Sequence, residues 1–214
     1  MKAGRRSLSS RITHLSLPIR GDRIELVAPS VDHVAATVRL MNDPAIARGT
    51  LHIPYPYSEK DARLWTRKSI RERRAGRSLG LRIVRRSDHE MLGGVGLHRL
   101  EEEAARAEIG YWLGKEYWGQ GYATEAVNLL PQFGFSCLDL HRIEARIFPG
   151  NAASLRLARR CGFRYEGRLR DEVVKNGRWQ ATLLFARIST DPPPAPSGSP
   201  RRPTRRRSAR RRAG

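Results

Sequence analysis

The stretch 117–125 (YWGQGYATE) carries the residues best suited to chemistry. It follows an apolar run at 106–113 that predicts a strand, and it opens a segment whose apolar residues recur at helical spacing. Gly119 and Gly121 let the backbone approach a ligand without a Cβ clash. The free N–H groups of residues 119–124 would point at one spot beside the positive end of the helix dipole, which is a site for an anion such as a pyrophosphate. An ordinary tight turn into a helix uses glycines equally well, so this turn alone leaves both interpretations open.

The elements that would position this turn alternate between strand and helix patterns. The sequence predicts strands at 23–29, 78–86, 91–100, 106–113, 142–148, 163–174 and 178–188. It predicts helices at 30–42, 58–75, 122–137 and 151–161. The order mixes hairpins with crossovers, so we expect one α+β domain over residues 21–190.

Local signals sharpen three of these elements. Asn176-Gly177 is the strongest short hairpin signal in the chain and joins the last two strands. Pro131 falls inside the helix 122–137 and is expected to kink or split it, because the carbonyl of Val127 loses its donor. The apolar face of that helix is expected to include Cys137.

The charge of the chain is unevenly distributed. The 214 residues carry 41 Lys+Arg and 21 Asp+Glu, a formal net charge of +20. Residues 191–214 hold eight arginines, one aspartate and six prolines, so we expect a disordered tail. Residues 1–20 read as a basic flexible leader, and their Arg- and Ser-rich character would also suit an organelle transit peptide. A basic chain of this kind suggests a nucleic-acid partner, yet much of the charge lies outside the predicted domain.

Several classes of protein are disfavoured by composition. No apolar stretch approaches the roughly 18 residues of a membrane span, and the basic start has no apolar segment typical of a secretory signal. Cys137 and Cys161 lie far apart without ligand-spaced histidines, so we expect two buried thiols in a cytoplasmic protein and no metal site.

The segment YWGQGYATEA resembles motif A of the GNAT N-acetyltransferases, in the form used by the RimJ/RimL group of ribosomal-protein N-terminal acetyltransferases. The resemblance extends over roughly residues 20–188 and includes AEIGYWL, HRIEARIFPGNAAS and GFRYEGRLRD. It implies a central, mostly antiparallel twisted sheet flanked by helices, whose fourth and fifth strands splay apart. Acetyl-CoA would lie in that wedge as the co-substrate, with no metal.

The resemblance also assigns the cofactor-binding residues. The amides of the turn would hold the pyrophosphate, the end of the fourth strand would pair with the pantetheine arm, and Asn151 would bond near the acetyl end, a role compatible with capping the helix 151–161. The residues implied are Trp112, Leu113, Trp118, Gly119, Gln120, Gly121, Tyr122, Ala123, Thr124, Asn151 and Ser154. Trp118 stands where the family motif usually has Gln or Arg, a departure that the RimJ/RimL group commonly shows.

Catalysis would transfer the acetyl group to an amine by direct attack. Glu108 matches the family carboxylate proposed to take the proton, directly or through water; an edge carboxylate paired with an arginine is the structural alternative. His98 is a possible second base, although a lone strand histidine is more often structural. Ala158 replaces the tyrosine that protonates the leaving thiolate in many members. Ser154 is then the best-placed general acid. A structural role, in which this first-turn serine caps its own helix, is an equally good interpretation.

The acceptor stays open at this point. The resemblance favours a protein N-terminus, with aminoglycosides and polyamines as alternatives, and the loop 52–57 and the Asn176-Gly177 hairpin are expected to shape the acceptor site. Glu101-Glu102-Glu103 would attract a cationic acceptor, or would simply be a solvated turn. The rival hypothesis is an inactive GNAT domain bound to ribosomes or RNA through its arginine-rich ends. A monomer and a homodimer are both compatible with the sequence.

Overall fold

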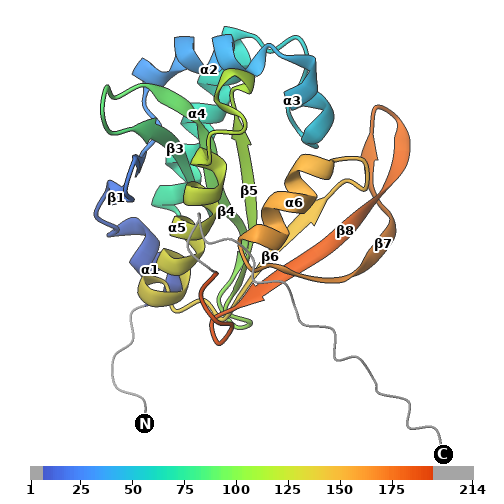
Figure 1. The fold of residues 1–214 in the computed structure, drawn as a ribbon. Helices are drawn as coiled ribbons and strands as arrows, with labels where there is room; N and C mark the ends of the chain where they lie inside the picture. Colours follow the sequence, from blue (N-terminus) through green and yellow to red (C-terminus); the bar gives the residue numbers. More distant parts are fainter. Residues whose placement is uncertain (1–6, 195–214) are drawn as a thin grey trace, which may run out of the picture.

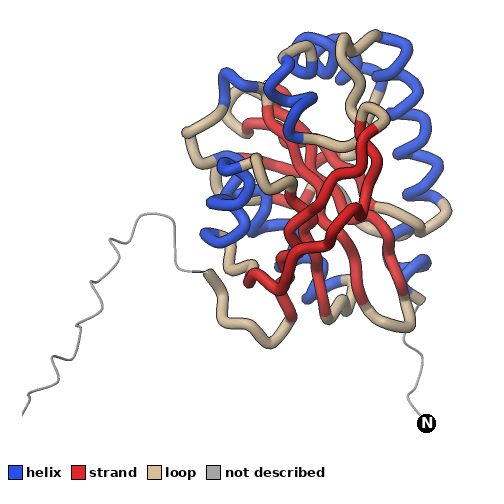
Figure 2. The backbone as a smooth tube through the Cα atoms, turned by 90° about the vertical axis from the view of Figure 1, so that its right-hand side faces the viewer, coloured by secondary structure: helices blue, strands red, loops and turns tan. Residues whose placement is uncertain are grey.

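A mixed sheet of eight strands forms the centre of the computed structural model, which describes residues 7–194, and helices cover both of its faces (Figures 1 and 2). The strands are β1 Ile19–Arg20, β2 Ile24–Val27, β3 Leu79–Arg85, β4 Met91–Glu101, β5 Arg106–Leu113, β6 Arg142–Ile147, β7 Arg164–Lys175 and β8 Arg178–Ile188. The helices are α1 Leu8–Thr13, α2 Val34–Met41, α3 Pro44–Gly49, α4 Glu59–Arg74, α5 Tyr122–Cys137 and α6 Ala152–Arg160, with 3-10 turns η1 Val31–His33 and η2 Lys115–Tyr117.

The strand order β1-β2-β3-β4-β5-β6-β8-β7 places one parallel contact in an otherwise antiparallel sheet. That contact joins β5 to β6 and covers only three residue pairs, of which Glu108↔Glu144 is the last. Beyond this pair the two strands diverge, so residues 109–113 of β5 have no strand beside them on the β6 side. The expected α+β fold with a splayed sheet is confirmed.

The core lies between the sheet and its helices. Helix α5 packs on β1, β2, β4 and β5, whereas α6 packs on β6 and β7. On the other face, α4 covers β3, and α2 packs against α4 and β4. In β6, Ile143, Ala145 and Ile147 are buried, and Glu144 between them is buried as well, so the strand does not alternate strictly. This packing fixes the start of α5 and the start of α6 at the place where β5 and β6 part.

The structure differs from the expected flexible leader at residues 8–13, which form α1. Leu8 and Ile12 are buried in the main core, and the Leu8 N–H donates to Glu102 Oε1 at 2.9 Å. The leader therefore adds apolar side chains to the core, which its overall basic composition did not indicate. The short strand β1 and helix α3 are likewise elements that the sequence did not predict. Most of the expected tail, residues 195–214, lies outside the described residues.

Helix α5 departs from expectation in two respects. It continues through Pro131 and is not split there, because Val127 and Leu130 are buried in the core and hold it in place despite the missing donor. Cys137 is exposed, so the expectation of two buried thiols is wrong for this residue; it is the last residue of the helix, where the apolar face leaves the core. Cys161 is buried, as expected.

Two further findings concern residues 7–194 only. No helix in this part of the chain combines the length and the hydropathy that crossing a membrane requires. Within the same residues, no cluster of three or more His, Cys, Asp or Glu side chains is arranged to hold a metal ion.

Candidate active site

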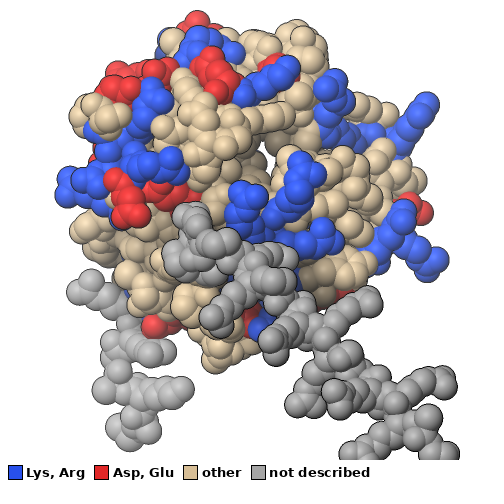
Figure 3. Space-filling view, in the orientation of Figure 1, with Lys and Arg blue, Asp and Glu red and all other residues tan. Residues whose placement is uncertain are grey.

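A cavity of about 1620 Å³ opens where β5 and β6 diverge. Its walls come from α3 and the loop that follows it, the end of β5, the turn before α5, the start of α6, and the β7–β8 hairpin. Figure 3 shows a hollow on this face with Lys and Arg side chains gathered beside it. Of the residues expected at the site, the cavity is lined by Trp112, Leu113, Trp118, Gly119, Gly121, Ala123, Thr124, Asn151 and Ser154.

The turn before α5 has the backbone conformation that the sequence suggested. Gly119 and Gly121 have φ of 76° and 86°, in the left-handed region that favours glycine, and Gly121 is the N-cap of α5. Because Gly121 has no side chain to bond the first-turn N–H groups, these groups are free for an anion. A Cβ on Gly119 would meet nothing within 4 Å, so there is room for a ligand beside it.

Two predicted residues of this turn do not line the cavity. The Gln120 side chain folds back, and its Nε2 donates to the Glu116 carbonyl at 2.8 Å. Tyr122 is buried against the core, and the guanidinium of Arg23 lies 4.7 Å from its ring centroid. Arg23 also donates to the Gln120 carbonyl at 3.1 Å, so it ties the start of β2 to the turn.

The start of α6 forms the opposite wall. Asn151 caps this helix, because its Oδ1 accepts from the Ser154 N–H at 3.1 Å, and its Nδ2 donates to the Gly49 carbonyl of α3 at 3.3 Å. The Tyr111 hydroxyl donates to the Ser154 carbonyl at 3.5 Å. Burial raises the pKa of Tyr111 to about 12, so this phenol stays protonated at neutral pH. Tyr111 is thus a second hydroxyl near Ser154, at a position to which no sequence motif pointed.

Glu108 does not line the cavity. It lies at the last paired position before β5 and β6 diverge, and its Oε2 accepts from Arg146 Nη1 at 2.7 Å and lies 3.3 Å from Arg99 Nη1. These partners match the structural alternative that the sequence allowed. His98, opposite Glu108 on β4, also lies outside the cavity, and burial lowers its pKa, so its imidazole is neutral at pH 7.

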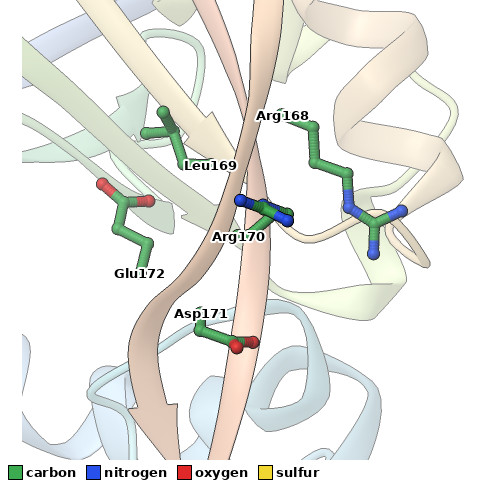
Figure 4. Close-up of a pocket in the computed structure, with 5 residues that line it drawn as sticks. All are labelled: Arg168, Leu169, Arg170, Asp171 and Glu172. Atoms are coloured by element: carbon green, nitrogen blue, oxygen red, sulfur yellow. The ribbon is translucent and has the colours of Figure 1, made fainter.

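The one carboxylate that lines the cavity among the described residues is Asp171, at a position that no sequence motif marked. It lies in a bulge of β7, where the register with β8 shifts between Leu169 and Val173, and its φ is 47°. Figure 4 shows Leu169 and Glu172 on one side of this strand and Arg168 on the other, near α6. The Glu172 carboxylate accepts hydrogen bonds from Thr182 and from Arg146.

The end of the cavity where the acceptor was expected includes Ile53, Pro54 and Tyr55 of the loop 52–57 and Asn176 of the hairpin, and we call it the acceptor end. Glu101, Glu102 and Glu103 do not contribute to it. Glu102 accepts from the α1 backbone and Glu101 pairs with Arg106, both at the other end of β5. All three glutamates are exposed, which favours the alternative of a solvated turn.

Comparison with known proteins assigns the fold to a family. Residues 23–164 match the acetyltransferase (GNAT) domain. The chain belongs to the GNAT family. RimL, a ribosomal L7/L12 α-N-protein acetyltransferase solved in complex with coenzyme A, matches with a TM-score of 0.73 at 27% identity, covering 80% of this chain and 98% of that one. The fold and the family that the motif predicted are confirmed.

The curated relatives that this chain resembles differ in the acceptor that their names state. The uncharacterized N-acetyltransferase p20 of Bacillus licheniformis is 40% identical over 51% of this chain, and the ribosomal-protein-serine acetyltransferase of Escherichia coli K12 is 27% identical over 78% of it and 93% of that protein. The spermidine N(1)-acetyltransferase of E. coli K12 is 32% identical over 48% of this chain and 55% of that protein. For the four Bacillus relatives matched first, the chain spans between 57% and 61% of their length.

Proposed function

We propose that this chain is an acetyl-CoA-dependent N-acetyltransferase whose acceptor is the α-amine of a polypeptide N-terminus. One observation carries the proposal: a single cavity joins the glycine turn before α5, the divergence of β5 from β6, and a separate wall made by α3 and the β7–β8 hairpin. A phosphate-bearing donor and an amine acceptor can therefore meet in one place. The names of RimL and of the ribosomal-protein-serine acetyltransferase of E. coli support a protein acceptor.

The residues present fit acetyl-CoA. The first-turn N–H groups of α5 would hold the pyrophosphate. The edge of β5 near Trp112 and Leu113, which has no strand on its β6 side, would bond the pantetheine amides through its backbone; the Leu113 carbonyl there also accepts from Trp118 Nε1 at 2.9 Å. Gly119 leaves the space that a bulky phosphate requires. Asn151 already bonds two backbone groups at the start of α6, so we propose that it acts there mainly by fixing the helix that faces the thioester.

When bound, acetyl-CoA supplies a thioester. The acceptor nitrogen forms a bond to its acetyl carbon, the carbon–sulfur bond breaks, and the amine proton must leave. A backbone N–H at the end of β5 would polarise the thioester carbonyl. Glu108 is the proposed proton acceptor through a water molecule, and Asp171 is the carboxylate that the cavity itself provides. Ser154 would protonate the departing sulfur, with Tyr111 as the neighbouring hydroxyl.

A small-molecule amine is the second candidate acceptor, supported by the spermidine acetyltransferase relative. The rival class, an inactive domain that binds ribosomes or RNA, would depend on arginines that lie mainly outside the described residues. These hypotheses are separated by incubating the full chain with acetyl-CoA and four acceptor types: peptides with a free α-amine, the same peptides α-blocked, spermidine, and an aminoglycoside. Release of coenzyme A thiol with free peptides alone supports the proposal. Release with spermidine alone would make a polyamine the acceptor. If no acceptor causes release and the chain binds RNA in a separate binding assay, the acetyltransferase proposal is overturned.

A further inference from the structure

The acceptor end of the cavity is strongly basic. Its walls include Arg48 at the end of α3, Arg168 and Lys175 of β7, and Arg178 of β8, against the single carboxylate Asp171. In a cleft lined by one sign of charge the field is concentrated, so a ligand of opposite charge is enriched there. This feature is independent of the glycine turn and of the unpaired strand edge that would bind the cofactor.

The arginines at this end form no close ion pair within the part of the chain that the structure describes. Elsewhere in the domain, arginines pair with acids, as Arg142 does with Glu144 and Arg146 with Glu172. Among residues 7–194, neither Arg48, Arg168 nor Arg178 forms an ion pair, and all three are exposed. Their guanidinium groups, with forks of N–H donors suited to carboxylates, are available to a ligand.

Two exposed aromatic side chains line the same end. Tyr55 is 56% exposed and Trp179 is 66% exposed. They come from the loop after α3 and from β8, on the two sides of the acceptor end. Tyr, Trp and Arg are the residue types enriched at sites that bind polypeptides, because rigid aromatic rings supply contact area at low entropic cost and guanidinium groups supply a fork of N–H donors. A small polyamine would use little of this surface, and its positive charge would be repelled.

We propose that the acceptor is a polypeptide whose residues just after the reactive α-amine are acidic. This inference rests on the proposed function and adds the charge class of its substrate. The carboxylates of the segment would bond Arg48, Arg168 and Arg178 while the amine reaches the thioester. This is the opposite of the charge preference that the Glu101–Glu103 turn suggested.

The test compares two peptides of equal length with the same first residue, one with Asp and Glu at positions 2 to 5 and the other with Lys there. For the full chain with acetyl-CoA, we expect kcat/KM for the acidic peptide to be at least tenfold higher at low ionic strength, and the ratio to shrink with added salt. In the double variant Arg168→Gln/Arg178→Gln the ratio should fall toward one. Arg67→Gln, an exposed arginine on α4, is the matched control and should keep it.

Binding of the same two peptides without acetyl-CoA, followed by tryptophan fluorescence, separates this inference from the proposed function. Tighter binding of the acidic peptide with no acetylation of any peptide supports the acidic-acceptor surface and overturns the acetyltransferase proposal. Equal kcat/KM and equal affinity for the two peptides, or a preference for the Lys peptide, overturns the inference and leaves the acetyltransferase proposal intact.

Discussion

The ammonium group of Lys175 lies 2.8 Å from the carbonyl oxygen of Ala47 and joins the β7–β8 hairpin to α3. The same Nζ donates to the carbonyls of Arg48 at 2.9 Å and Thr50 at 2.5 Å, and it lies 4.9 Å from the Phe148 ring centroid. Carbonyls at the end of a helix lack backbone donors, and a cation there also complements the helix dipole. One side chain therefore connects the two walls of the acceptor end.

Replacement of Lys175 by Met should separate these walls. We expect the KM for the peptide acceptor to rise several-fold and the free energy of unfolding to fall by about 1–3 kcal/mol, since three carbonyls lose their donor. Acetyl-CoA affinity should change little, because the phosphate turn lies elsewhere. Steady-state kinetics and urea denaturation test this, with Lys60→Met on exposed α4 as the control. An unchanged KM would show that the contacts of Lys175 with α3 do not shape the acceptor site.

A second prediction follows from the left-handed backbone conformation of Gly121. Gly121→Ala should weaken acetyl-CoA binding roughly tenfold or more, because a Cβ costs about 1–2 kcal/mol at a φ of 86° and shifts the first N–H groups of α5. Isothermal titration of the full chain measures the affinity. Gly167→Ala is the matched control, since a Cβ there meets nothing within 4 Å and its φ is not left-handed. Equal affinities for both variants would contradict the proposed phosphate site.

The identity of the proton acceptor can be decided between two carboxylates. If Glu108 acts through water, Glu108→Gln should lower kcat by about a hundredfold, as expected for loss of a general base, and leave acetyl-CoA affinity intact. Asp171→Asn should then change kcat only slightly. The limb of the pH–rate profile that reports deprotonation should disappear in the variant that removes the true base. A large loss in Asp171→Asn with normal Glu108→Gln would reassign the role to the bulge of β7.

A buried cation predicts a stabilising substitution. Arg82 is fully buried, its guanidinium nitrogens have no hydrogen-bond partner among the described residues, and it lies 4.1 Å from the Trp65 ring centroid. Burial lowers its pKa from 12.5 to about 10. The lowered pKa means that burial costs the charged form more than the contact with the Trp65 ring returns. Arg82→Met should therefore raise the free energy of unfolding by about 1 kcal/mol at pH 7.

The pH dependence of this effect has a definite sign. Below pH 10 the penalty is fully present, and between about pH 10 and 12.5 the unfolded chain binds more protons than the folded chain. The stability advantage of Arg82→Met over the wild type should therefore shrink as the pH rises through that window. Arg67→Met is the surface control. A loss of stability in Arg82→Met at pH 7 would show that the guanidinium has a stabilising partner.

The two cysteines should differ in reactivity. Cys137 is exposed, whereas Cys161 is buried, its Sγ donates to the Thr124 carbonyl at 3.7 Å, and burial raises its pKa to about 12. A disulfide reagent added to the native protein should modify Cys137 quickly and Cys161 only after denaturant is added. Peptide mapping identifies the labelled residue. Fast labelling of Cys161 in the native protein would contradict the packing of α6 against α5.

Local signals in the sequence account for most of the fold. The Asn176-Gly177 turn has its cause within a few residues, so the sequence predicts it well. Helix α3 was not predicted because six residues are too few to show helical periodicity of apolar side chains, although Asp43 caps the helix and Pro44 starts it. Helix α1 was concealed by the basic residues around Leu8 and Ile12.

The site was predictable where a turn defines it and not where distant segments meet. The glycine turn before α5 has its conformation encoded in its own residues. The position of Asp171 depends on a bulge that shifts the register of β7, and Lys175 meets Ala47 across 128 residues. The expectation for Glu108 came from the family resemblance. Its pairing with Arg146 follows from side-chain packing around the parallel strands, which no local pattern specifies.

The most direct measurement is a time course of the full chain with acetyl-CoA and a peptide that has a free α-amine, followed by mass spectrometry and by release of coenzyme A thiol. The account predicts that one acetyl group appears on the α-amine for each thiol released, and that the α-blocked peptide shows neither. Absence of acetylated product from every amine offered, with acetyl-CoA left intact, would contradict it.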